Sequence, residues 1–217
     1  MLRVRPPPRL FVLLARDVPV AVVLRRGPSA WCHVVRWDLT TDRLDHGAWI
    51  RGRIFAERCD LSPDGELLVA FVYRGARAGT SYTDAWTAVS RPPWLHALGL
   101  WPQGTTYGGG GRFTDARTLV LRACSTSAHP AHPGLGISVS LGNPPTHEIA
   151  ETVEGAEWAG RGSDGTLVFA REGKLYRRKG TRDALVADLT DLEPAPAAPP
   201  DWAMAPIETG RTRSSPK

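Results

Sequence analysis

The sequence predicts an all-β protein, and three observations lead to this prediction. Short runs of alternating or wholly apolar residues recur along the chain, and glycine, proline and aspartate separate them. Among the 217 residues are 22 glycines and 19 prolines, a content typical of a loop-rich β protein and high for a helical one. The apolar spacing typical of helices is nearly absent. These features favour an antiparallel sandwich, barrel or propeller architecture.

The predicted strands are short, closely spaced and bounded by turn residues. We expect sixteen of them, at about 9–15, 18–25, 31–38, 43–50, 53–60, 66–73, 84–90, 94–101, 109–113, 117–123, 136–141, 146–152, 156–162, 166–171, 174–178 and 184–189. The phrase at 37–44 reads as a hairpin between the third and fourth strands of a first unit. Residues 185–189 would then be the last strand of a fourth unit.

A turn phrase recurs at nearly regular intervals. Its full form, Ser-Pro-Asp-Gly, occupies residues 62–65; the proline presets the turn and the glycine is free to adopt a positive φ. A good echo lies at 162–165 and a weaker one at 114–116. The aspartates of the three phrases, Asp64, Asp115 and Asp164, are 51 and 49 residues apart. This period indicates an internal repeat of one four-stranded unit each time.

The phrase resembles the turn between the first two strands of each blade in TolB-like and WD40-like β-propellers. The resemblance covers residues 9–190 and implies a small β-propeller-like array of about four four-stranded antiparallel sheets, in a domain at residues 1–190. In the first unit, residues 14–18 keep a short turn without the phrase. A small closed ring, an open stack that needs a partner and a twisted sandwich are alternative arrangements.

Residues 191–217 form a Pro/Ala-rich C-terminal tail with a different composition. Residues 193–200 are of polyproline type and cannot join a β-ladder. Apolar side chains return around Trp202. We expect this tryptophan either to pack back on the domain or to be presented as a binding motif.

The chain is basic, and arginine supplies most of the positive charge. Lysine and arginine number 27 against 22 acidic residues, a net charge of +5, and only residues 174, 179 and 217 are lysines. The densest internal cluster is Arg177, Arg178, Lys179 and Arg182. A solvated basic loop is the first interpretation of this cluster, and a nucleic-acid-binding face is the alternative.

The cysteines and the N-terminus favour a cytoplasmic protein. Cys32, Cys59 and Cys124 are an odd number without a Cys-x-x-Cys pair, so we expect free thiols in apolar surroundings. Arg16 and Asp17 break the apolar run that follows Arg9. The run is therefore too short for the apolar region of a signal peptide. No apolar run reaches the length of a membrane span, so no membrane partner is expected.

No motif in the chain predicts a cofactor or a metal. Asp60, Ser62 and Asp64 match the first half of a calcium loop, but its twelfth position is Phe71, which cannot bind the ion. His129 and His132 are spaced to share a metal, yet nothing in the sequence places a third ligand. The glycine-rich stretch at 107–112 lacks the Gly-Lys-Ser/Thr of a phosphate loop.

These observations favour a non-catalytic protein–protein interaction module that belongs to a larger bacterial assembly. Another protein chain is therefore the expected partner, and the candidate binding residues are Trp202, Arg177, Arg178, Lys179, Arg182, His129 and His132. One alternative is an enzyme with an active site at the end of the propeller funnel, for which the candidates are Asp60, Asp115, His129 and His132. A second alternative is a nucleic-acid-binding accessory protein that uses a basic face.

The first unit is strongly apolar, with the runs 10–14 and 20–24. In an open array, the end sheets would expose such runs to water, which promotes aggregation. We therefore expect this unit to be covered, either by residues 174–189 closing a ring or by another chain.

Overall fold

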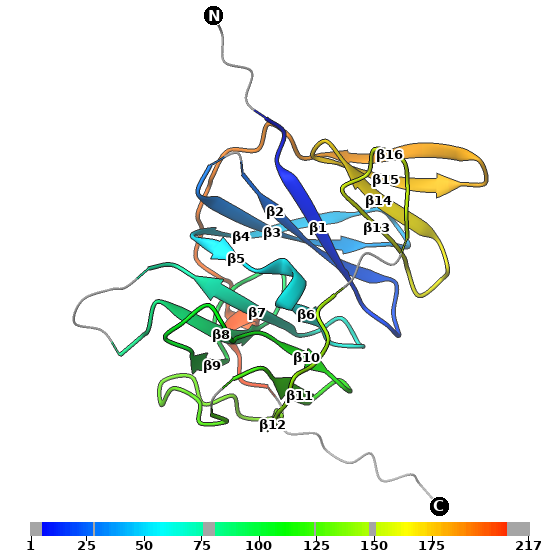
Figure 1. The fold of residues 1–217 in the computed structure, drawn as a ribbon. Helices are drawn as coiled ribbons and strands as arrows, with labels where there is room; N and C mark the ends of the chain where they lie inside the picture. The colour runs from blue at the N-terminus through cyan, green and yellow to red at the C-terminus, as the bar shows by residue number, and fades with distance from the viewer. Residues whose placement is uncertain (1–5, 28, 76–80, 124, 148–150, 208–217) are drawn as a thin grey trace, which may run out of the picture.

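A computed structural model describes residues 6–27, 29–75, 81–123, 125–147 and 151–207, which form four β-sheets (Figure 1). Strands hold 43% and helices 4% of these residues, so the predicted all-β class is confirmed. None of the four sheets closes into a barrel within these ranges. No helix in the same ranges is long and apolar enough to cross a membrane.

Each sheet is formed by strands that follow one another in the sequence. Sheet A contains β1 (Arg9–Leu14), β2 (Val20–Arg26), β3 (Trp31–Asp38) and β4 (Leu44–Arg51). Sheet B contains β5 (Arg53–Ile54), β6 (Asp60–Leu61), β7 (Leu68–Tyr73), β8 (Ala85–Ser90) and β9 (Gly99–Pro102). Sheet C contains β10 (Gly111–Phe113), β11 (Thr118–Leu121) and β12 (Ser138–Leu141). Sheet D contains β13 (Trp158–Arg161), β14 (Leu167–Arg171), β15 (Lys174–Lys179) and β16 (Arg182–Asp188); two short helices are η1 (Ala56–Arg58) and α1 (Asp201–Met204).

The three turn aspartates occupy equivalent positions, as their spacing predicts. Asp64 lies between β6 and β7, Asp115 between β10 and β11, and Asp164 between β13 and β14. Each of these pairs of strands is antiparallel. In each turn the aspartate Oδ1 accepts a hydrogen bond from the backbone N–H two residues later, at 3.2, 2.8 and 3.0 Å respectively. The repeated phrase therefore builds the same turn in sheets B, C and D.

Sheet C differs from the expected four antiparallel strands. It has three strands among the described residues, and β12 runs parallel to β11. After β11 the chain crosses to sheet B, where Pro133 pairs with Gly99 at the start of β9. The chain then returns to sheet C and enters β12 in the same direction as β11. The connection between these two strands is therefore a crossover and not a hairpin. The strand predicted at 146–152 can be compared at residues 146, 147, 151 and 152, because residues 148–150 lie outside the described residues. None of these four residues is in a strand, so the prediction is wrong there.

The strand predicted at 53–60 is also wrong as one continuous element. It is divided into β5, η1 and β6, and both strand pieces pair with β7. Ile54 lies opposite Val72 and Asp60 opposite Val69. Because five residues of this segment must span only two residues of β7, the single helical turn takes up the extra length.

The sheets pack in the order D, A, B, C, although D is last in the sequence (Figure 1). One cluster of buried apolar residues joins D to A, a second joins A to B, and a third joins B to C. None of the buried clusters found in the described ranges combines residues of C and D.

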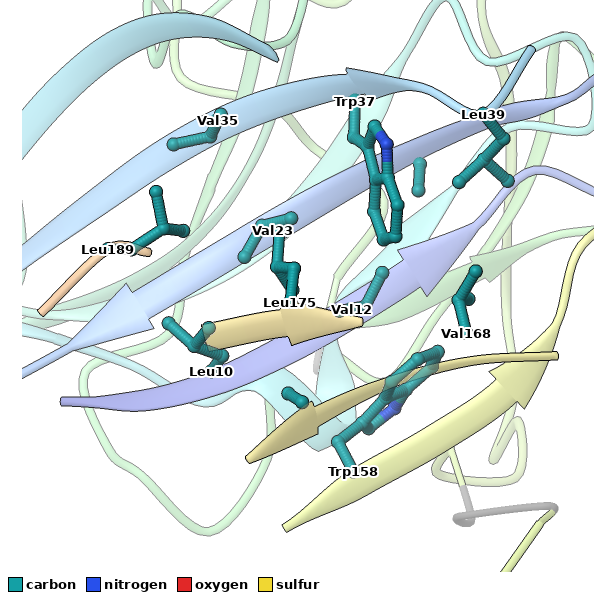
Figure 2. Packing of buried hydrophobic residues seen from close by; sticks show 12 residues of the cluster. Leu10, Val12, Val23, Val35, Trp37, Leu39, Trp158, Val168, Leu175 and Leu189 are labelled. Atoms are coloured by element: carbon teal, nitrogen blue, oxygen red, sulfur yellow. The ribbon is translucent and has the colours of Figure 1, made fainter. Parts of the chain in front are cut away.

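Strands β1 and β2 of sheet A are buried on both faces, which explains their long apolar runs. Figure 2 shows the side turned to sheet D, where Leu10, Val12 and Val23 pack with Leu175 and Leu189. All five side chains are at most 3% exposed. Alternate residues of the same strands face sheet B. The first unit is therefore covered, as predicted, and the cover on this side comes from β13 and β14 as well as from residues 174–189.

The C-terminal tail packs on the domain as far as residue 207, and we call residues 189–207 the strap. The strap runs from sheet D past sheet A to α1 (Figure 1). Near its start, the Arg25 guanidinium donates hydrogen bonds to the carbonyls of Leu189 and Thr190, at 2.6 and 2.9 Å. Near its end, Ile207 is 5% exposed and joins the core between sheets B and C.

Two of the three cysteines can be compared with the prediction. Cys32 and Cys59 are buried free thiols, as expected. Burial raises the pKa of the Cys59 thiol to about 12, so it stays protonated. Cys124 lies outside the described residues.

Candidate functional site

A cleft of about 500 Å³ lies between sheet A, the turns of sheet B and the strap. Trp202 forms part of its wall, and this residue is 52% exposed. The lining residues are Arg36, Arg43, Asp45 and His46 from sheet A; Gly65, Glu66, Arg91, Pro92, Pro93 and Trp94 from sheet B; and Pro200 and Trp202 from the strap. We call this site the Trp202 cleft.

The wall formed by sheets A and B is tightly packed. The Ala48 N–H of β4 donates a hydrogen bond to the Pro93 carbonyl at 2.9 Å. Gly47 lies so close that a Cβ atom there would be 2.3 Å from the same oxygen. The Trp94 N–H in turn donates to the Arg91 carbonyl at 2.9 Å. The turn that carries Trp94 is therefore fixed on β4.

The strap holds Trp202 on an equally well anchored turn. Ala203, the next residue, is fully buried, whereas Trp202 is half exposed. The Ala205 N–H donates to the Asp201 carbonyl at 2.9 Å, which closes the single turn of α1. The Arg91 guanidinium bonds the carbonyls of Ala205 and Pro206. The indole thus projects from a turn whose following residues are anchored to the domain by the burial of Ala203 and by Arg91.

The cleft combines aromatic and proline walls with a small excess of positive charge. Arg43 and Asp45 neutralise each other in an ion pair of 2.7 Å. Of the other charged lining residues, Arg36 and Arg91 are basic and Glu66 is acidic. Such a surface suits a partner that brings apolar groups and a carboxylate.

Behind the cleft, two histidines of sheet A bond each other. The His46 Nδ1 and His33 Nε2 atoms are 3.0 Å apart, and His33 Nδ1 lies 3.1 Å from the Ala48 carbonyl. His33 also stacks on Trp49, with ring centroids 4.1 Å apart. Burial lowers the pKa of His33 to about 4 and also lowers the pKa of His46, so both rings are neutral at pH 7. His33 is therefore a buried side chain whose two ring nitrogens both have hydrogen-bond partners.

The basic cluster at 177–182 does not form a single groove. Arg177 is 8% exposed and points to sheet A, where it pairs with Asp42 at 2.6 Å. Arg178 points to the other side of β15 and pairs with Asp183 at 2.7 Å. Lys179 and Arg182 are exposed at the hairpin between β15 and β16. Because neighbouring strand residues alternate, the cluster is divided between two faces.

His129 and His132 lie in a loop packed against sheet B. His129 Nε2 is 2.7 Å from the Ser81 hydroxyl, and His132 Nε2 is 2.9 Å from the Tyr82 hydroxyl. His132 Nδ1 is 2.8 Å from the Ala97 carbonyl. Because these ring nitrogens are used in hydrogen bonds, the pair acts as a loop anchor. Across the described residues, no three His, Cys, Asp or Glu side chains gather as a metal site.

The residues named for an enzyme are not brought into one hydrogen-bonded site. Asp60 is 1% exposed and bonds His147, whereas Asp115 lies in an exposed turn and accepts from the Arg117 and Thr118 N–H groups. His129 and His132 bond groups of sheet B instead. No hydrogen bond between these four candidates is present in the described part of the chain.

A second surface, which we call the arginine groove, lies at the opposite end of β3. Arg26, Arg53 and Arg74 line its outer half together with Phe55 and Tyr73, and no carboxylate is among the described lining residues. The groove continues inward past Arg9 and Arg25, where Glu57 and Glu157 also contribute. This arrangement places basic and aromatic groups side by side.

Comparison with known proteins found no matching family model, no similar curated protein and no similar solved structure. The geometry described above is therefore the basis of the functional argument. Among the candidate binding residues, only Trp202 lies in the cleft. Sequence reasoning missed Arg91 and Trp94, although the phrase Arg-Pro-Pro-Trp at 91–94 was visible as a turn with an aromatic residue beside it.

Proposed function

We propose that this protein is a non-catalytic interaction module that holds a segment of another protein in the Trp202 cleft. The observation that carries the proposal is the half-exposed indole of Trp202 on a backbone turn that the buried Ala203 and Arg91 anchor to the domain. Tryptophan and arginine dominate the binding energy of protein interfaces. A side chain that is already held in place loses little further entropy on binding.

The chemistry of the cleft favours an extended, proline-containing segment. Trp94 and Trp202 provide aromatic walls, and prolines 92, 93 and 200 limit the space between them. Extended proline-rich segments dock in grooves of this kind because their conformation is set before binding. Arg36 would pair with a carboxylate that flanks the proline.

The scaffold in this proposal is a four-unit, propeller-like array within a larger bacterial assembly. Its inner strands would be β1, β6, β10 and β13. Contacts of β1 with both β6 and β13, and of β6 with β10, support this arrangement. The equivalent turns at Asp64, Asp115 and Asp164 support it as well.

The test is affinity purification of the tagged chain from its native host, with identification of the proteins that co-elute. The Trp202→Ala variant should lose a partner that the unchanged chain retains. Leu185→Ala is the matched control, because Leu185 is also a large exposed apolar residue, 56% exposed, on β16. A synthetic peptide from the partner should then bind and shift tryptophan fluorescence. Equal recovery by both variants would contradict the proposal.

The arginine groove favours nucleic-acid binding as a second candidate function. Single-stranded nucleic acids bind grooves in which arginines contact phosphates and aromatic rings stack on bases. The Arg26→Glu/Arg74→Glu variant should weaken binding of a labelled single-stranded oligonucleotide at least about tenfold and flatten its salt dependence. The charge-matched control is Lys179→Glu/Arg182→Glu, on sheet D. Equal losses in the two variants would show a general charge effect and contradict this candidate.

A further inference from the structure

A separate cavity of about 270 Å³, partly open to solvent, lies where sheet A meets sheet B. Its walls are mainly apolar and come from β4, β7, β8, β9 and the segment before β9. The described lining residues are Ile50, Ala70, Val72, Arg74, Gly75, Tyr82, Thr83, Trp86, Ala88, Ser90, Leu95, Ala97 and Leu100. None of these residues lines the Trp202 cleft.

The cavity exists because small side chains meet at this point. Ala70 of β7 and Ala88 of β8 lie opposite each other in the strand register, and both line the cavity. Protein interiors are otherwise packed as densely as organic crystals, with few voids larger than a water molecule. An apolar cavity of about 150 Å³ is sufficient to bind benzene. A space of this size is thus a binding pocket in volume and in lining.

Ser90 gives the cavity one polar group that has no protein partner. Ser90 is 2% exposed, and its Oγ atom has no hydrogen bond in the described structure. Buried hydroxyl groups nearly always have a partner, because an unpaired one costs free energy. The neighbouring Thr83 hydroxyl is already used, since it donates to the Ala85 carbonyl at 2.6 Å. Ser90 is therefore free to bond a ligand.

We propose that this cavity binds a small, mainly apolar organic molecule, larger than benzene, whose single hydroxyl or carbonyl group bonds Ser90 Oγ. The ring or chain of the ligand packs on Trp86, Leu95 and Leu100. The apolar walls offer few hydrogen bonds to the water that a ligand would displace, which favours an apolar ligand. The inference does not depend on the function proposed for the Trp202 cleft.

The first experiment compares 2-naphthol with 2-methylnaphthalene as probes of the unmodified protein. Calorimetry should show one site for 2-naphthol, and saturating probe should raise the melting temperature. In the Ser90→Ala variant, the preference for 2-naphthol over 2-methylnaphthalene should fall by about threefold to tenfold, the range expected for one hydrogen bond. Failure of 2-naphthol to bind or stabilise the protein would overturn the proposal, as would an unchanged preference in Ser90→Ala.

Filling the cavity provides the second experiment. Ala88→Leu places a larger side chain on the cavity wall and should abolish 2-naphthol binding. If this variant does not fold, Ala97→Leu fills the same cavity from the segment before β9 and should have the same effect. Ala184→Leu on β16 is the control, which should bind 2-naphthol like the unchanged protein. Undiminished binding in a folded Ala88→Leu or Ala97→Leu variant would overturn the proposal, because the probe would then sit elsewhere.

Discussion

His147 Nε2 donates a hydrogen bond to the Oδ1 atom of Asp60 at 2.9 Å, between residues 87 positions apart in the sequence. Asp60 Oδ2 accepts a second bond from the Phe113 N–H of β10 at 2.8 Å. Arg16, in the turn of sheet A, lies 3.5 Å from the same oxygen. One buried carboxylate of sheet B thus joins sheet A, sheet C and the segment that leaves sheet C. Such a network links the three sheets at this point.

The first prediction is that Asp60→Ala strongly destabilises the protein. The change leaves the Phe113 N–H and His147 without their acceptor in a site that is 1% exposed. An unpaired buried donor costs about 1–3 kcal/mol, so the free energy of unfolding should fall by about 2–4 kcal/mol. Urea unfolding measures this loss. Asp115→Ala, in an exposed turn, is the control and should lose clearly less.

The local parts of the fold could be predicted from the sequence. The turns at Asp64, Asp115 and Asp164 and the hairpin at 37–44 depend on neighbouring residues, whose chemistry is visible in the chain. The strands of sheet A were visible as well, since burial on both faces requires continuous apolar runs.

The parts that depend on distant residues could not be predicted in the same way. The helical turn within 53–60 follows from the register with β7, and the parallel direction of β12 follows from a crossing past Gly99. The Trp202 cleft needs the strap to lie beside the turn at 91–94, residues that are far apart in the sequence. No local pattern encodes these pairings.

A second prediction uses two glycines of equivalent turns. Gly65 has φ +71° and Gly165 has φ +78°, so alanine is strained by about 1–2 kcal/mol at either position. A Cβ atom at Gly65 would also lie 3.2 Å from Val20, whereas nothing lies within 4 Å at Gly165. Gly65→Ala should therefore destabilise the protein more than Gly165→Ala does. Urea unfolding of both variants measures the two losses in the free energy of unfolding. Equal losses would contradict the prediction that the contact with Val20 adds to the cost at Gly65.

A third prediction concerns pH. Burial lowers the pKa of folded His33 to about 4, below the value of about 6.5 in an unfolded chain. The unfolded state therefore binds the proton first, so stability is complete above pH 6.5 and falls as the pH decreases from 6.5 to 4, by about 1.4 kcal/mol per pH unit. His33→Gln keeps a donor and an acceptor but does not titrate. The stability difference between the two proteins should narrow over this range, and a constant difference would contradict the prediction.

The last prediction concerns the cover of sheet A. Residues 174–217 include β15, β16 and the strap, which place Leu175 and Leu189 against Leu10, Val12 and Val23. A fragment of residues 1–173 keeps β13 and β14 but loses this part of the cover, and it should be insoluble unless a partner covers the exposed apolar surface. Expression followed by size-exclusion chromatography measures this. A chain ending at residue 207 keeps the whole described strap and is the control, which should stay soluble. A soluble, monomeric fragment 1–173 that unfolds cooperatively would mean that the core is complete without β15, β16 and the strap.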